Sequence, residues 1–73
     1  MATKDWTRED AFQRVFFDKK KSPGVYEYVI DIFMNVDGRW NLHILFNGTT
    51  EYQEHFKTEA AAIKFAKSYM RSH

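Results

Sequence analysis

Two histidines and several carboxylates in the middle of the chain fall on one face of the predicted β-sheet. A strand over residues 25–36 and another over residues 39–46 place Asp31 directly opposite His43 when joined by a short turn. A carboxylate beside an imidazole can orient a general base, and two histidines with acids can hold a metal ion. The same face carries further polar residues: Glu27, Glu51, Gln53 and His55.

An alternative reading of Asp31 and His43 is a solvated cross-strand ion pair. The chain has no cysteine, no serine recognisably paired with a base, and no glycine loop that cradles phosphate. We therefore expect a non-enzymatic protein with no cofactor and no metal. A small ribonuclease or metal site at His43 and Asp31 is the third of three functional hypotheses.

The turn at Asp37-Gly38 sets which residues share a face. Apolar residues alternate before it and after it, and a two-residue turn would place the two rows on opposite faces. A three-residue loop with a left-handed Gly38 as a bulge places both rows together. In that register Val29 lies opposite Leu45.

Composition limits the protein's class. The 73 residues include seven Phe, four Tyr and two Trp, and the net charge is +1. We expect one domain over residues 1–73, with residues 1–6 as a tail and aromatic side chains supplying a small core. The near-neutral charge argues against strong non-specific binding to nucleic acid or acidic membranes. No apolar run is long enough to cross a bilayer, and we expect a cytoplasmic protein.

The predicted fold class is α+β, with the order helix, three-stranded antiparallel meander, helix (αβββα). Thr7 as an N-cap and an apolar stripe of Phe12, Val15 and Phe16 predict a first helix over residues 7–20. The meander uses strands over 25–36, 39–46 and 51–57, with a second turn at Asn47-Gly48.

Thr58 is the predicted N-cap of the second helix. Its apolar face repeats at helical spacing: Ala62, Phe65, Ala66, Tyr69 and Met70. This face should cover the side of the sheet that carries Ile30, Ile32, Trp40 and Ile44. The first helix either shares that side or covers the opposite one.

Several residues fall at positions where a known family has counterparts: Pro23, Tyr26, Asn47-Gly48 and Thr58-Glu59-Ala60-Ala61-Ala62. With the predicted element order, they resemble the double-stranded-RNA-binding domain. In that family the last helix begins with lysines that grip phosphates, whereas this chain has Glu59 and Ala60. The resemblance therefore implies a shared fold that has lost its usual RNA-binding surface.

A second set of residues is similar to the meander-plus-helix module of HicB-type antitoxins: Asp37-Gly38-Arg39-Trp40, Phe56-Lys57-Thr58, Ala62 and Ala66. The proline-rich motif of that family is absent. This likeness too implies a fold and no activity.

The favoured function is a small interaction protein that binds a larger protein and modulates or inhibits it. Short domains without catalytic residues are typical of phage-type regulators of host machines such as RNA polymerase, in which case transcription would be the regulated process. An aromatic on a polar helix face is typical of an interface, and Phe17 has that place on the predicted first helix. The alternative is that the helix end bends, so that Phe17 packs against the strand over residues 25–36. The expected protein-binding residues are Phe17, Val29, Phe33, His43 and Leu45. The chain would be a monomer or a weak homodimer.

The alternative function is a module that binds structured RNA or DNA. Two basic groups would hold the phosphates: Lys19, Lys20 and Lys21, and Lys64, Lys67 and Arg71. The two groups would merge into one strip if the two predicted helices lay side by side.

Overall fold

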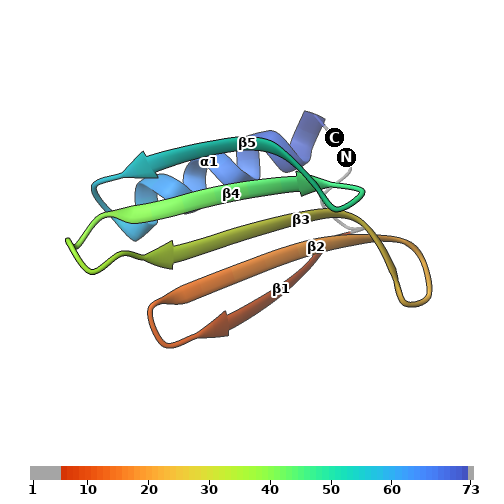
Figure 1. The fold of residues 1–73 in the computed structure, drawn as a ribbon, viewed down its shortest axis with the longest axis horizontal. Helices are drawn as coiled ribbons and strands as arrows, with labels where there is room; N and C mark the ends of the chain where they lie inside the picture. The colour runs from red at the N-terminus through yellow and green to blue at the C-terminus, as the bar shows by residue number, and fades with distance from the viewer. Residues whose placement is uncertain (1–5, 73) are drawn as a thin grey trace.

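The computed structural model describes residues 6–72, which form a five-stranded antiparallel sheet followed by a helix (Figure 1). The strands follow chain order across the sheet: β1 (Trp6–Ala11), β2 (Arg14–Ser22), β3 (Val25–Met34), β4 (Trp40–Phe46) and β5 (Thr49–Phe56). The helix α1 (Glu59–Ser72) packs on one face of the sheet, against β3, β4 and β5.

The predicted first helix is wrong, and with it the predicted αβββα fold class. Residues 7–20 instead contribute most of the hairpin formed by β1 and β2. The helical stripe required Phe12, but its side chain is 89% exposed at the tip of the hairpin, where Gln13 has a φ of 55°. Of the tail expected over residues 1–6, Trp6 belongs to β1, and residues 1–5 lie outside the described residues.

Strand pairing explains why the hairpin forms. Val15 lies opposite Ile32 and Phe17 opposite Ile30, so β2 adds two large apolar side chains to the core. Both are nearly inaccessible to solvent, at 2% and 3% exposure. Residues 7–20 are compatible with a helix, but pairing with β3 stabilises them more than a local helix would. Tertiary contacts override weak local propensity.

The β3–β4 hairpin confirms the predicted register. Asp31 pairs with His43 and Val29 with Leu45. The Asn35 N–H donates to the Arg39 carbonyl at 2.7 Å, and Gly38 has the expected left-handed backbone, with a φ of 89°. The Asn47-Gly48 turn between β4 and β5 also has positive φ values, 52° and 81°, as a tight hairpin turn of this type requires.

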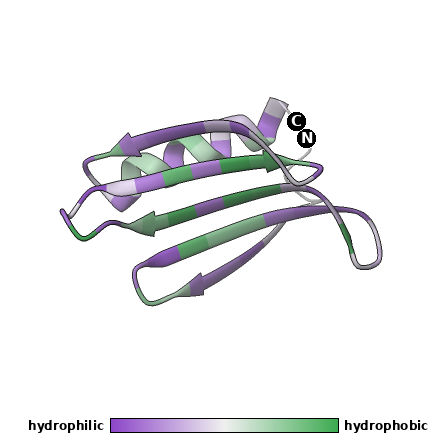
Figure 2. Ribbon diagram, viewed as in Figure 1, coloured by the Kyte–Doolittle hydropathy of each residue, from purple (hydrophilic) through white to green (hydrophobic). Residues whose placement is uncertain are grey.

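The core lies between α1 and the facing side of the sheet. Figure 2 shows the hydrophobic residues gathered in β2, β3 and β4, with more hydrophilic residues along β1 and β5. The fully buried sheet residues are aliphatic: Ile30, Ile32, Leu42 and Ile44. The predicted helix face is confirmed, with Ala62, Ala66 and Met70 buried against them. The N-cap is confirmed as well, because the Thr58 hydroxyl accepts a hydrogen bond from the Ala61 N–H at 3.2 Å.

Aromatic rings complete the core at both ends of α1. Near its end, Tyr28 contacts the rings of Trp6, Phe46 and Tyr69, with centroid separations of 4.8–6.1 Å. Near its start, Phe65 stacks on Tyr52 at 5.3 Å and packs against Phe56 at 5.6 Å. These rings account for much of the aromatic content of the chain and leave few of them for the opposite face of the sheet.

Two phenylalanines of the β1–β2 hairpin test this fold. Phe17→Ala should lower the free energy of unfolding by about 3–5 kcal/mol, because it removes a buried ring. Phe12→Ala should change it by less than about 0.5 kcal/mol, because that ring is exposed. Urea denaturation of both variants measures the difference. Equal effects at the two positions would contradict the β1–β2 hairpin.

Candidate interaction face

The sheet face opposite α1, called the outer face below, is crossed by three rows of side chains. No described helix or strand covers this face. The strand registers define the rows, read from β1 to β5: Thr7, Asp18, Val29, Leu45 and Thr50; Glu9, Phe16, Asp31, His43 and Gln53; Ala11, Arg14, Phe33, Asn41 and His55.

Apolar side chains occupy the middle of the outer face. Phe16, Val29, Phe33 and Leu45 are each half-buried, although no element within residues 6–72 lies over them. Asp31 lies among them, next to Val29 and Phe33 on its own strand and opposite Phe16 on β2. The centre of the face is therefore apolar with one carboxylate inside it.

Arg14 neutralises that central carboxylate. Its Nε donates to Oδ1 of Asp31 at 2.9 Å and its Nη2 donates to Oδ2 at 2.8 Å, which is a two-point ion pair. The hydrogen bond and the charge of Asp31 raise the pKa of Arg14. His43, although opposite Asp31, shares a hydrogen bond of 2.9 Å with the Thr50 hydroxyl. Asp31 therefore bonds to Arg14, and His43 to Thr50, in place of the Asp31–His43 contact that a general base would need.

The geometry offers little support for a metal centre. Within residues 6–72, no group of three or more histidine, aspartate or glutamate side chains is placed to hold a metal ion. The hypothesis of a metal site at Asp31 and His43 therefore lacks a ligand set in the described part of the chain.

Two buried polar groups of the outer face have unsatisfied atoms. Asp18 is only 6% exposed, and its Oδ1 has no hydrogen-bond partner. Burial raises the pKa of Asp18, and the nearby Glu9 carboxylate raises it further, against the opposing effect of Lys20. Asn41 donates from its side-chain amide to Asn35, but its Oδ1 also lacks a partner. Both free atoms are hydrogen-bond acceptors.

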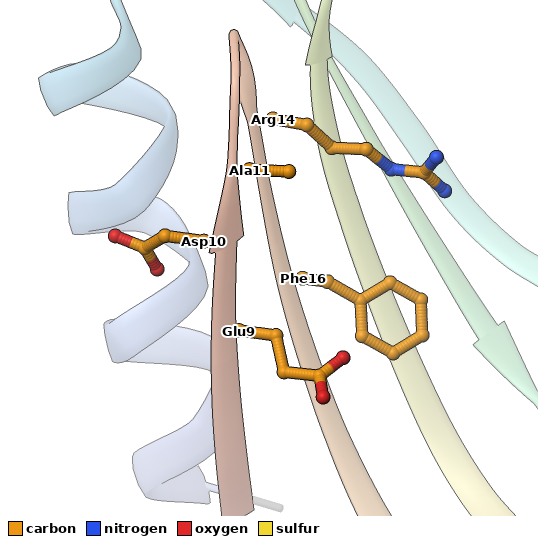
Figure 3. A pocket seen from close by; sticks show the side chains of 5 residues that line it. All are labelled: Glu9, Asp10, Ala11, Arg14 and Phe16. Carbon is orange, nitrogen blue, oxygen red and sulfur yellow. The ribbon is translucent and has the colours of Figure 1, made fainter.

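A hollow opens at the β1–β2 end of the outer face. Its volume is about 540 Å³ and its lining residues are Glu9, Asp10, Ala11, Arg14 and Phe16. Figure 3 shows the Glu9 carboxylate beside the Phe16 ring, with Arg14 extending to the same side. Asp10 points the other way, toward α1. There it forms an ion pair with Arg8 at 2.8 Å.

Four of the five expected protein-binding residues lie on the outer face: Val29, Phe33, His43 and Leu45. The fifth, Phe17, lies in the core with the Arg8 guanidinium over its ring, so its expected exposure is wrong. Sequence reasoning missed Glu9, Arg14 and Phe16, because it placed them on a helix. The signal for a strand was the alternation along residues 14–17. Val15 and Phe17 face the core, whereas Arg14 and Phe16 lie on the outer face.

The basic residues lie in two settings. At the end of β2, Lys19 lies over the ring of Tyr28 and Lys20 over that of Tyr26, and Lys21 is exposed. On α1, a shallow groove of about 390 Å³ is lined by Ala60, Ile63, Lys64, Lys67 and Arg71. The predicted first helix, which was expected to lie beside the second and bring the two groups together, is absent from residues 6–72, where β1 and β2 take its place.

Comparison of the chain with protein-family models, curated proteins and solved structures found no match. The first helix required by the resemblance to double-stranded-RNA-binding domains is replaced by β1 and β2. Among the described residues, no helix is sufficiently long and apolar to span a membrane.

The Arg14–Asp31 ion pair can be measured by a double-mutant cycle. Arg14→Gln and Asp31→Asn, alone and together, should give a coupling free energy of about 0.2–1 kcal/mol, because both groups are partly solvated. The coupling should fall as salt is raised. Urea denaturation at low and high salt measures both quantities, and a coupling of zero at low salt would contradict the pair.

The raised pKa of Asp18 predicts that Asp18→Asn increases the stability of the folded protein by an amount that depends on pH. Because the folded protein holds this proton more tightly than the unfolded chain, stability is lost as pH rises from the usual aspartate pKa through the raised one. Asparagine cannot ionise, so the variant should be more stable than the parent at pH 7. The difference should shrink below a pH of about 4.

Thermal denaturation between about pH 3 and pH 8 compares the stability of Asp18→Asn with that of the parent protein. This range brackets the ordinary aspartate pKa of about 3.9. Glu51→Gln, the same charge change at an exposed site of β5, serves as the matched control. A gain for Asp18→Asn that is independent of pH would show that burial of the charge is not its cause.

Proposed function

We propose that this chain is a small binding protein that docks its outer face on a larger protein and thereby modulates it. The observation that carries the proposal is a half-buried apolar centre on a sheet face that no described helix or strand covers. A solvated face of an antiparallel sheet is ordinarily polar. Here Phe16, Val29, Phe33 and Leu45 occupy its centre.

Polar groups around the apolar centre support the same proposal. An apolar patch with a polar rim is typical of protein interfaces. His43 and Thr50, which share a hydrogen bond, and the Arg14–Asp31 ion pair lie on the same face and supply polar groups for a docked protein. The face thus supplies buried area at its centre and directional contacts around it.

The outer face bears on the kind of partner. It presents one apolar patch with polar groups around it, a surface suited to docking on a larger protein. Regulators encoded by phages and mobile elements, acting on host machines such as RNA polymerase, form a class of proteins that work by such docking.

A second candidate function is the binding of structured RNA or DNA. It is favoured by the groove on α1, where Lys64, Lys67 and Arg71 flank an apolar strip. Three cations along one helix face could contact successive phosphates. Loss of affinity with rising salt is the signature that distinguishes this function from an apolar interface.

Phe33→Gln tests the favoured function, with Phe12→Gln as its matched control. Each purified variant is immobilised and exposed to nuclease-treated lysate at moderate salt. Phe33→Gln should lose the captured protein by about tenfold or more, because a central ring at an interface is worth at least 1–2 kcal/mol. Phe12→Gln, on an exposed turn, should retain it.

Capture that is unaffected by Phe33→Gln would contradict docking through the outer face. Capture that disappears on nuclease treatment and is weakened by Lys67→Gln would favour the groove on α1 instead. Circular dichroism of each variant establishes that the sheet is intact before binding is compared.

A further inference from the structure

We infer that the hollow at the β1–β2 end of the outer face is a binding site for an arginine side chain presented by a protein partner. The inference rests on the proposed function and deepens it, because it names the chemistry of the partner. The site consists of Glu9 and Phe16, with Ala11 and Arg14 at its borders.

Glu9 and Phe16 are directly paired across β1 and β2. Paired side chains on one face of an antiparallel ladder lie within contact distance of each other. Figure 3 shows the carboxylate beside the ring on the outer side of the sheet. A flat cation lying over the ring could therefore reach the carboxylate with its edge, using cation–π attraction and a charge-assisted hydrogen bond together.

The charge around the hollow favours a cation. Within residues 6–72, Glu9 makes no ion pair, so no described side chain is paired with its charge. The nearby positive charge of Arg14 is already neutralised by Asp31. An anion entering the hollow would meet Glu9, and an uncharged group would cover that carboxylate without pairing it.

Asp18 adds a second carboxylate beside the site. It lies next to Phe16 on the same face, in the row of Thr7, and does not itself line the hollow. The negative charge of this part of the outer face therefore extends beyond Glu9.

Arginine fits this site better than lysine. Its guanidinium is planar, stacks on aromatic rings and pairs with a carboxylate at two points, whereas the lysine ammonium is compact and strongly hydrated. The hollow, which the small Ala11 side chain borders, has a volume of about 540 Å³. That space accommodates the guanidinium and its alkyl stem.

The shape of the hollow indicates a side chain from a protein. The hollow lies on an open face, so a free small molecule would remain largely solvated. Phe16 also borders the central apolar patch, through its pairing with Asp31 between Val29 and Phe33. A partner seated on that patch would hold its arginine in place over the hollow.

A titration of the folded full chain tests the site. The probe is the capped peptide acetyl-Gly-Arg-Gly-amide, followed by chemical shifts of the backbone amides. Saturable shifts should appear in β1 and β2. The citrulline peptide, which is neutral and nearly the same shape, should bind at least about tenfold more weakly, and the lysine peptide several-fold more weakly.

Three variants locate the binding. Glu9→Gln and Phe16→Leu should each weaken the arginine peptide by about fivefold or more, because each removes one of its two partners. Glu51→Gln, on the opposite edge strand, should leave the affinity unchanged. Equal binding of arginine and citrulline peptides, shifts outside β1 and β2, or absence of saturable shifts would each overturn the inference.

The failure of this inference is distinguishable from failure of the proposed function. If Phe33→Gln abolishes protein capture but the arginine peptide does not bind, the outer face docks a partner without this arginine site. If capture is unaffected by Phe33→Gln, the proposed function fails, and the inference as a partner site fails with it.

Discussion

The close approach of α1 to the middle of the sheet is the constraint on which the rest of this structure depends. Ala62 and Ala66 are fully buried against aliphatic residues of β3 and β4 that are likewise inaccessible. A side chain no larger than a methyl group lets the helix backbone lie near the sheet. Each buried aliphatic contributes about 1.5–3 kcal/mol. A chain without cysteine has no disulfide to replace that contribution.

The elements around this contact could be predicted because their signals are local. Gly38 requires a left-handed backbone, and that requirement fixes the loop length and therefore the pairing of Asp31 with His43. Thr58 begins α1 by capping its first turn, and the helical spacing of alanines identifies the buried side. In each case a few neighbouring residues determine the outcome, so β3, β4, β5 and α1 follow closely from the sequence.

The β1–β2 hairpin could not be predicted in the same way, because its stability comes from residues distant in sequence. Phe17 is buried through its pairing with Ile30, and a helix over the same residues satisfies the local pattern nearly as well. The error removed two of the five strands from the expected sheet, and with them Glu9 and Phe16. The central part of the candidate site was therefore predictable, while the hollow at its end was visible only in three dimensions.

The edge strand β1 and the outer face of the sheet differ in how another protein could bind to them. The edge strand β1 is charged at three successive positions, and Arg8 and Asp10 pair with each other on the side of α1. Charged edges discourage the addition of a further strand.

The outer face has the opposite character, with apolar side chains at its centre and unpaired acceptors at Asp18 and Asn41. Backbone pairing along β1 is thus disfavoured, while side-chain docking on the face is not. A protein docked on this face, as we propose, would be selected by its shape and by its side chains. That selection is more specific than strand addition, because a main-chain ladder accepts many sequences whereas a side-chain surface accepts only a complementary one.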